Sequence, residues 1–378
     1  MRSAWPCLAA LLTLAPAIAQ AAPARTLVSA TPVAGAPAGA VAYRIVYRTT
    51  TGRGTPVQAS GIIVVPTGRA PPGGRDIVAW EHGTTGIADA CAPSANGWRF
   101  SIIAGLAPLI ARGRIVVAPD YIGLGSAGTH PFLVGEDTGR AVLDAVRAAR
   151  EVPGAGATGR FALWGESQGG HAALWSGRLA RRYAPELRLV GVAAAAPATD
   201  LVANIAGGSN AAVRALMTAY AGVSWSHVYG VPLSTVTGPV GQDLMRRLAQ
   251  QCVTLDGFKL RTKIGLVRLT HALRRVDLAA LPRWGELMRR NSAAPTPLGV
   301  PLLVAQGSAD VIIAPAVTRA WVTAVCRAGQ RVRFIPVAGG DHVTIARRTA
   351  DETVAWLDDR FADRPAPSDC ATLQGRTG

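Results

Sequence analysis

The sequence predicts an α/β protein whose mostly parallel sheet of eight strands is covered by helices. Three observations predict this fold. Six short apolar runs after residue 76 have the composition of buried parallel strands, helical patterns separate most of them, and a glycine-flanked serine lies where one run meets a helical pattern. With 378 residues and 49% hydrophobic content, the chain can bury a large core without a partner.

The expected strands fall into two groups along the chain. An Ala/Pro-rich lead, residues 21–40, precedes the first strand. Residues 41–48 and 57–65 alternate loosely between apolar and polar side chains, which predicts an antiparallel pair. The six apolar runs that follow are expected to be parallel, and they cover residues 77–80, 115–118, 161–164, 189–192, 302–305 and 332–336.

Helical patterns separate most of the later strands, and one long interval contains helical patterns alone. The separating helices are expected at residues 137–151, 168–183, 317–327 and 346–361. Between Asp200 and Leu298 the sequence has amphipathic stretches and no convincing core strand. A loop of that length is improbable inside a compact domain, so we expect an inserted helical cap over one edge of the sheet. The expected division is a core of residues 22–200 and 298–378 with a cap of residues 201–297.

The N-terminus has the pattern of a signal peptide, which we assign to residues 1–21. Arg2 supplies positive charge, the apolar stretch 4–15 is too short to span a bilayer, and small residues at 17–21 offer a cleavage site. A retained membrane anchor is the alternative, and the short apolar stretch disfavours it. We therefore expect an exported protein, either secreted or periplasmic.

The cysteines fit export. Cys7 lies in the removable segment, which leaves four: Cys91, Cys252, Cys326 and Cys370. An even number in an exported chain indicates two disulfides, for which the spacing leaves three pairings open. No Cys-x-x-Cys spacing occurs, so a zinc or redox site is disfavoured, and we expect neither a metal nor an organic cofactor.

The net charge of +16 does not predict a nucleic-acid partner. Only Lys259 and Lys263 are lysines, and the remaining basic residues are arginines spread along the chain. They form no compact run interleaved with aromatic residues. A solvated basic surface is the favoured interpretation, and attraction to anionic lipid or cell-envelope polymers is the alternative.

The glycine-flanked serine is the strongest functional signal. Residues 161–164 lead into Gly165-Glu-Ser167-Gln-Gly169, and an alanine-rich helical pattern follows directly. This context is typical of a nucleophile elbow, where a tight strand-to-helix turn holds a serine hydroxyl clear of the sheet. An ordinary glycine-rich turn is the alternative. We expect Ser167 to be the nucleophile.

A serine nucleophile needs a histidine base and a carboxylate that orients it. Asp310 follows the strand 302–305 in a glycine-containing turn, and His342 follows the last strand on a loop with two glycines. These positions match the order serine, acid, histidine of this type of site. Asp341 is a rival acid, but adjacent residues rarely point their side chains at one another. We therefore favour Asp310 as the acid.

The oxyanion of the reaction also needs hydrogen-bond donors. We expect one from the backbone N–H of Gln168 and a second from the loop after the strand 77–80, with Thr84 preferred to Thr85. A glycine turn without a donor role is the alternative for that loop. Three residues after the strand 115–118 are expected to line an acyl pocket: Tyr121, Leu124 and Phe132. Asp120 in the same segment is expected to fix a turn.

Several segments match a known family in their order along the chain. They are the loop 82–84, the segment 118–125 with its trailing residues 130–135, the motif 164–170, and the turns 307–310 and 341–342. The Ala-Pro-Asp-Tyr start of the second segment is more specific than the serine motif. On these residues the chain resembles the secretory lipase family of α/β-hydrolases, which includes yeast lipase A and many bacterial exported proteins.

The resemblance implies an α/β-hydrolase fold with a helical cap inserted before the strand that carries the acid. It implies hydrolysis of acylglycerols or similar lipid esters by a triad of Ser167, Asp310 and His342. It also implies two disulfides that tie the cap to the core and the C-terminal tail to the domain, namely Cys91–Cys252 and Cys326–Cys370.

The leading hypothesis is therefore an exported serine esterase or lipase acting on a small-molecule or lipid ester, with peripheral contact to a lipid interface. An acyltransferase or peptidase would use the same triad and stays open. A catalytically silent hydrolase-fold protein that binds lipid or envelope polymer is the alternative from another class. The sequence gives no basis for assigning an oligomeric state.

Overall fold

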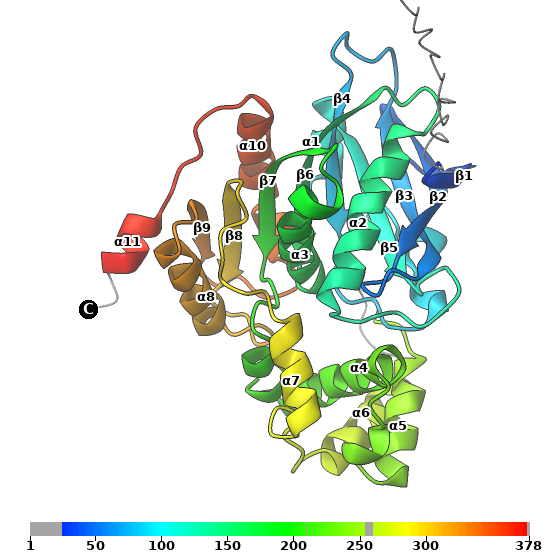
Figure 1. Cartoon of the computed structure of the whole chain (residues 1–378), viewed down its shortest axis with the longest axis vertical. Coiled ribbons are helices and arrows are strands. Elements are labelled where there is room, and N and C mark those ends of the chain that lie inside the picture. Colours follow the sequence, from blue (N-terminus) through cyan, green and yellow to red (C-terminus); the bar gives the residue numbers. More distant parts are fainter. Residues whose placement is uncertain (1–24, 209, 254–259, 376–378) are drawn as a thin grey trace, which may run out of the picture.

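The computed structural model of the protein describes residues 25–208, 210–253 and 260–375 (Figure 1). The signal peptide expected at residues 1–21 lies outside these described residues. One sheet of nine strands forms the centre of the molecule, in the order β1-β2-β3-β5-β4-β6-β7-β8-β9. Its strands are β1 (Leu27–Val33), β2 (Ala40–Thr50), β3 (Pro56–Pro66), β4 (Arg75–Glu81), β5 (Ile115–Ile122), β6 (Ala157–Glu166), β7 (Arg188–Ala195), β8 (Leu302–Gly307) and β9 (Val332–Val337).

The sheet is antiparallel at its N-terminal edge and parallel elsewhere. β1 pairs with β2, β2 with β3 and β3 with β5 in antiparallel fashion. The remaining pairs, which join β5, β4, β6, β7, β8 and β9 in this order, are all parallel. Because all six parallel strands end at the same edge, the loops that follow them meet there. This edge is where the predicted site residues lie.

The sheet has one strand more than the eight expected from the sequence. The additional strand, β1, lies within the Ala/Pro-rich lead and is mostly exposed or half-buried, so it lacks the apolar face that marks a strand. Pro32 is tolerated because β1 is an edge strand. The Glu151 carboxylate accepts the amides of Thr26 and Leu27, both at 2.9 Å, which fixes the start of the strand.

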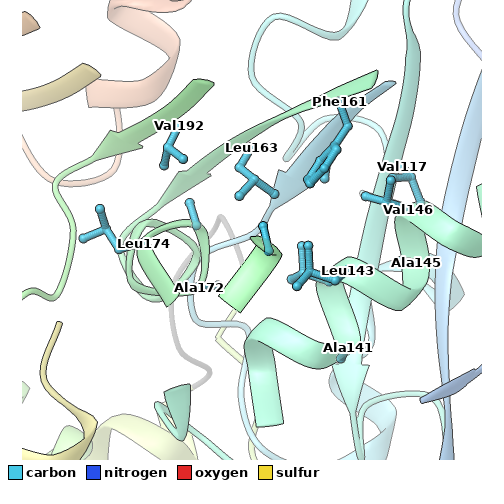
Figure 2. Packing of buried hydrophobic residues seen from close by; sticks show 14 of the residues in the cluster. Val117, Ala141, Leu143, Ala145, Val146, Phe161, Leu163, Ala172, Leu174 and Val192 are labelled. Atoms are coloured by element: carbon cyan, nitrogen blue, oxygen red, sulfur yellow. The ribbon is translucent and has the colours of Figure 1, made fainter. Parts of the chain in front are cut away.

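Helices cover both faces of the sheet, which agrees with the almost continuous burial of the parallel strands. On one face, α2 and α3 pack on side chains such as Phe161 and Leu163 of β6 (Figure 2). On the other face, α1 and α10 pack on the intervening Ala162 and Trp164. The helices of the two layers are α1 (Leu106–Ala111), α2 (Gly135–Arg150), α3 (Gln168–Tyr183), α8 (Pro315–Arg327), α9 (Ile345–Arg348), α10 (Ala350–Phe361) and α11 (Cys370–Gly375).

The described part of the chain between β7 and β8 is helical and contains no strand. It comprises η3 (Val202–Ala206), α4 (Ala211–Tyr229), η4 (Leu233–Thr235), α5 (Pro239–Ala249), α6 (Leu260–Ala272) and α7 (Pro282–Asn291). Their apolar side chains form a cluster around Trp225, Met245 and Trp284 that also includes core residues such as Phe132 and Ile313. We call the helices from α4 to α7 the cap. The domain boundaries at residues 200 and 298 stay a prediction.

Two disulfides join distant parts of the chain. Cys91, at the end of the short helix η1 (Asp89–Cys91), is bonded to Cys252 in the cap, and Cys326 of α8 is bonded to Cys370 of α11. Of the three pairings that the spacing allowed, this is the one that the family resemblance implied. Within the described ranges, no helix is both long enough and apolar enough to cross a membrane.

Candidate active site

Ser167 occupies the sharp turn between β6 and α3. Its φ of 59° and ψ of −117° place a residue with a Cβ atom in a conformation that costs free energy, as a nucleophile elbow requires. The residues two positions before and after Ser167 must be glycines because other backbone atoms lie too close to leave room for a side chain. A Cβ atom on Gly165 would lie 2.1 Å from the Gly169 carbonyl oxygen, and one on Gly169 would lie 1.8 Å from the Glu81 carbonyl oxygen.

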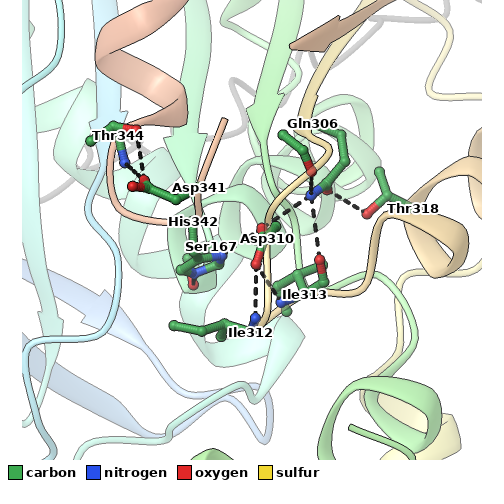
Figure 3. A network of polar contacts seen from close by, with 10 residues as sticks. Ser167, Gln306, Asp310, Ile312, Ile313, Thr318, Asp341, His342 and Thr344 are labelled. Atoms are coloured by element: carbon green, nitrogen blue, oxygen red, sulfur yellow. Dashed lines mark hydrogen bonds and ion pairs between the residues drawn. The ribbon is translucent and has the colours of Figure 1, made fainter. Parts of the chain in front are cut away.

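The structure brings Ser167, His342 and Asp310 together at the carboxyl edge of the sheet (Figure 3). Ser167 Oγ lies 2.8 Å from His342 Nε2, and His342 Nδ1 lies 2.8 Å from Asp310 Oδ2. An ionised carboxylate can only accept, so Nδ1 carries the proton and donates it to Asp310. Nε2 is then free to accept the serine proton, which is the tautomer that general-base chemistry needs.

Asp310 is held in place by four hydrogen-bond donors. The amides of Ile312 and Ile313 donate to Oδ1 at 2.9 and 2.8 Å, and Gln306 Nε2 and His342 donate to Oδ2 at 3.0 and 2.8 Å. Burial by itself would raise the pKa of this carboxyl group, but the hydrogen bond and charge of His342, with the two amides, lower it below its ordinary value. Asp310 is therefore ionised at neutral pH.

Asp341, the rival acid, serves a different purpose. Its exposed carboxylate accepts the amide of Thr344 at 2.9 Å and the hydroxyl of the same residue at 2.6 Å, so it caps the turn after His342. These two hydrogen bonds lower the pKa of Asp341. The carboxylate that contacts the imidazole is that of Asp310.

The loop after β4 passes directly over Ser167. A Cβ atom built on Gly83 would lie only 3.6 Å from the Cβ of Ser167. Thr84 and Thr85 line the same cavity as Ser167. Among the described residues, the backbone amides of Thr84 and Gln168 have no protein acceptor. The Thr85 amide likewise has no acceptor among the described residues, and the Thr85 carbonyl accepts the amide of Val253 from the cap at 2.8 Å.

Ser167 and His342 open into a cavity of about 290 Å³ between the sheet edge and the cap. Most of its lining is apolar. The cap contributes Val213, Leu216 and Met217 from α4, and the core side contributes residues such as Trp98 and Ile102. A cavity of this kind next to a serine–histidine pair suits the acyl chain of an ester.

The three residues expected to line the acyl pocket lie elsewhere. Tyr121, Leu124 and Phe132 are fully buried and do not line this cavity. Gly123 and Gly125 both have positive φ values and turn the chain back into the protein after β5, so these side chains pack beneath the site. The sequence places them near the sheet edge but does not reveal the direction of that turn. This part of the prediction is wrong.

Two charged residues of the cavity were not predicted. Glu166, the variable residue before the serine, lines the cavity together with Arg347. Burial raises the pKa of Glu166 to about 7, while the charges of His342 and Arg347 act in the opposite direction. By the alternation of β6, Glu166 lies on the same face as Trp164, and this pattern does not by itself place Glu166 at the cavity. No sequence signal places Arg347 at the cavity.

Asp120, expected from the sequence to fix a turn, lies inside β5 and joins it to two distant segments, β3 and the short helix η2 (Pro93–Ala95). Its carboxylate accepts the Ser60 hydroxyl at 2.6 Å and the Ser94 amide at 2.8 Å. His171 is also structural, because its Nε2 lies 2.7 Å from the Asn291 carbonyl oxygen in the interior and burial lowers its pKa to about 4. Neither residue lines the cavity.

A sequence model of the secretory lipase family matches residues 102–369, which include Ser167, Asp310 and His342. The chain belongs to the secretory lipase family. A relative named as a probable inactive lipase of Mycobacterium tuberculosis is 26% identical over 346 residues, covering 87% of this chain and 75% of the relative. Lipase 5 of Candida albicans is 28% identical over 289 residues, covering 71% of this chain and 59% of that lipase. The match thus spans less than two thirds of the Candida lipase.

Solved structures of secretory lipases and esterases share the fold. Candida antarctica lipase A superimposes with a TM-score of 0.70 at 18% identity, covering 91% of this chain and 84% of that structure. LipA, a rice cell wall degrading esterase from Xanthomonas oryzae, superimposes with a TM-score of 0.72 at 21% identity, covering 90% and 99%. These likenesses confirm the predicted α/β-hydrolase fold for this secretory lipase family member.

Proposed function

We propose that this member of the secretory lipase family is an exported serine hydrolase that cleaves carboxylic esters through an acyl-enzyme. One observation carries the proposal. Ser167 Oγ, the His342 imidazole and the Asp310 carboxylate form an unbroken hydrogen-bond chain with two distances of 2.8 Å, at the wall of an apolar cavity. No metal or organic cofactor takes part in the proposed reaction.

In the first half of the reaction, Ser167 Oγ attacks the ester carbonyl carbon while His342 Nε2 takes its proton. The imidazolium is stabilised by Asp310 and then gives the proton to the departing alcohol oxygen. In the second half, His342 takes a proton from water, the hydroxide attacks the acyl carbon, and the proton returns to Ser167 as the acid leaves.

The negative charge on the carbonyl oxygen needs donors at the moment of attack. We assign this role to the backbone amide of Gln168, which directly follows Ser167, and to that of Thr84, which lines the cavity; neither amide has an acceptor among the described residues, and the amide of Thr85 is the alternative to that of Thr84. Losing one such donor typically costs about 10²- to 10³-fold in kcat. The N-terminus of α3, which begins at Gln168, adds a favourable field.

The cavity supports an acyl chain as the recognised part of the substrate, which includes acylglycerols and related lipid esters. Two disulfides support an oxidising compartment, either the periplasm or the medium. On the cap, Val240, Ile264 and Val267 are exposed apolar side chains of α5 and α6. They support peripheral contact with a lipid interface.

A catalytically silent lipid-binding protein is a second candidate, because one relative is named as a probable inactive lipase. The hydrogen-bond chain from Ser167 to Asp310 favours an enzyme, since each link has the length and direction that catalysis needs. An acyltransferase or a peptidase would share this chain and differ in the acceptor or leaving group.

The deciding experiment is labelling of the purified protein with a fluorophosphonate, followed by hydrolysis of p-nitrophenyl esters from two to sixteen carbons. We expect labelling of the wild type and of Ser29→Ala, a control on the exposed edge strand β1. Ser167→Ala should lose both labelling and hydrolysis. Wild-type protein that neither labels nor hydrolyses any ester would support the silent binder. Emulsified and soluble substrates, compared side by side, separate a lipase from a short-chain esterase.

A further inference from the structure

Two buried rings are each hydrogen-bonded to one of the two segments that carry the proposed oxyanion donors. Tyr121, at the end of β5, stacks on His130 with ring centroids 5.8 Å apart and an angle of 19° between the planes. Both side chains are fully buried and neither reaches the cavity. Each, however, holds one of the two segments from which the oxyanion donors come.

Tyr121 holds the loop that carries Thr84. Its hydroxyl donates to the carbonyl oxygen of His82 at 3.0 Å, and its ring lies 4.5 Å from that of His82. The backbone of Tyr121 has a φ of 73°, which is unfavourable for an aromatic residue. The strand pairing is also irregular at this point, with a register shift in β3 between Ser60 and Gly61. The Tyr121 hydroxyl therefore contacts the loop that carries Thr84 from a locally strained backbone position.

His130 holds the residue that provides the other donor. Its Nδ1 lies 3.0 Å from the carbonyl oxygen of Ile122, which can only accept, so Nδ1 carries the hydrogen. Nε2 is then an acceptor, and the side-chain Nε2 of Gln168 donates to it at 2.8 Å. Burial lowers the pKa of His130 to about 3, so the ring stays neutral and keeps this polarity.

The cap holds the same histidine from its other side. Ser224 of α4 donates its hydroxyl to the His130 carbonyl oxygen at 2.7 Å and accepts the Phe132 amide at 2.9 Å. Trp225 donates its indole N–H to the Phe132 carbonyl oxygen at 2.8 Å. Helix α4, which lines the cavity, is thus hydrogen-bonded to the segment that contains His130, and His130 in turn contacts Gln168.

We propose that Tyr121 and His130 are positioning residues that together set the two halves of the oxyanion hole. Tyr121 fixes the loop of Thr84 through His82, and His130 fixes the first turn of α3 through the side chain of Gln168. The inference rests on the proposed ester hydrolysis, because only a developing oxyanion makes the direction of these amides matter. A misplacement of about 1 Å can cost about 10²-fold in rate.

The test measures kcat and KM with p-nitrophenyl butyrate for single substitutions that delete one hydrogen bond each. Tyr121→Phe removes only the hydroxyl group. His130→Asn keeps a donor for Ile122 but cannot reach Gln168, whereas His130→Gln puts an acceptor oxygen back near the Nε2 position. Gln168→Met removes the donor from the other side and leaves the backbone N–H in place. Tyr47→Phe is the matched control, since it deletes a buried hydroxyl that has no hydrogen-bond partner in the part of the chain that the structure describes.

We expect Tyr121→Phe, His130→Asn and Gln168→Met to lower kcat by about 10- to 100-fold with KM changed less than about threefold. Affinity for a boronic acid that mimics the tetrahedral intermediate should fall in parallel. His130→Gln should recover most of kcat, and Tyr47→Phe should match the wild type. Thermal unfolding of each variant shows whether the variant is folded. A loss of folded protein would lower the active fraction without changing KM or the affinity for the boronic acid.

Two results would overturn the inference alone. One is an active wild type whose folded Tyr121→Phe and Gln168→Met variants keep wild-type kcat and boronic acid affinity. The other is a failure of His130→Gln to exceed His130→Asn. A wild type that hydrolyses no ester removes the proposed function and this inference together, and is recognised before any variant is made.

Discussion

The two regions that enclose the cavity are built differently. On the sheet edge, Ser167, His342 and Asp310 are fixed by hydrogen bonds of 2.8 to 3.0 Å, and the supporting groups are largely buried. The cap faces the same cavity with the apolar side chains of Val213, Leu216 and Met217. Apolar contacts have no fixed direction, whereas hydrogen bonds do. The core is therefore suited to set the chemistry, and the cap to select the acyl chain.

The largest effect should come from the core. Asp310→Asn keeps the shape of the acid but favours the wrong tautomer of His342, so we expect kcat to fall by about 10³- to 10⁴-fold. The matched control is Asp341→Asn, which alters the neighbouring turn and leaves the hydrogen-bond chain intact. Steady-state kinetics on a short-chain ester check both variants. Equal losses in the two would show that the acid has been assigned wrongly.

The cap should change the choice of substrate and leave the chemistry intact. Met217→Trp fills part of the cavity, so kcat/KM should fall by about 10- to 100-fold for long acyl chains and change little for acetate esters. Val267→Trp, on the exposed outer face of α6, is the control and should not alter the chain-length profile of soluble esters. A uniform loss for all chain lengths with Met217→Trp would contradict the division of roles.

The two disulfides offer a third comparison. Each closes a long loop, with sequence separations of 161 for Cys91–Cys252 and 44 for Cys326–Cys370, so removing either with paired serines should cost about 2–5 kcal/mol of unfolding free energy. Only the first joins the cap to the core, so only its loss should alter KM for long-chain esters. Denaturant unfolding and kinetics at a temperature where both variants are folded test this. Identical KM values in the two variants would refute it.

The smallest effect concerns Glu166, whose pKa burial raises to about 7 from a reference of 4.5. The folded state then binds a proton that the unfolded state releases, so the wild type should lose stability relative to Glu166→Gln as pH rises from about 4.5 to about 7, by about 1–3 kcal/mol. Above that range the difference should stay constant. Glu286→Gln, on the exposed side of α7, is the control. Parallel stability curves for wild type and Glu166→Gln would contradict the raised pKa.

The sequence predicts the fold well because parallel strands and their helices have strong local patterns. The spacing of apolar runs gives all six parallel strands, and the turn glycines around Ser167 indicate the elbow. The strand order and the family then indicate where Asp310 and His342 lie, and the structure brings these residues within hydrogen-bonding distance. Their catalytic roles stay a prediction.

What the sequence does not predict depends on contacts between distant segments. β1 has no buried face of its own and is defined by pairing with β2, so its local pattern is weak. The cavity lining combines core loops with Val213, Leu216 and Met217 of α4, and the position of α4 over the sheet is a tertiary property. Tyr121 follows the predicted strand 115–118, but in the structure it lies inside β5 with a φ of 73° and a fully buried side chain, and one sequence cannot reveal that angle.

The disulfide between Cys91 and Cys252 also limits how far the cap can separate from the core. Next to it, the Val253 amide donates to the Thr85 carbonyl, and Gly86 leaves room for the sulfur, since a Cβ there would lie 2.6 Å from Cys91 Sγ. This corner is therefore a covalent attachment of the cap to the core, next to the loop that carries Thr85. While the bond is intact, Cys252 stays beside Cys91, which excludes a movement that would carry this part of the cap away from the core.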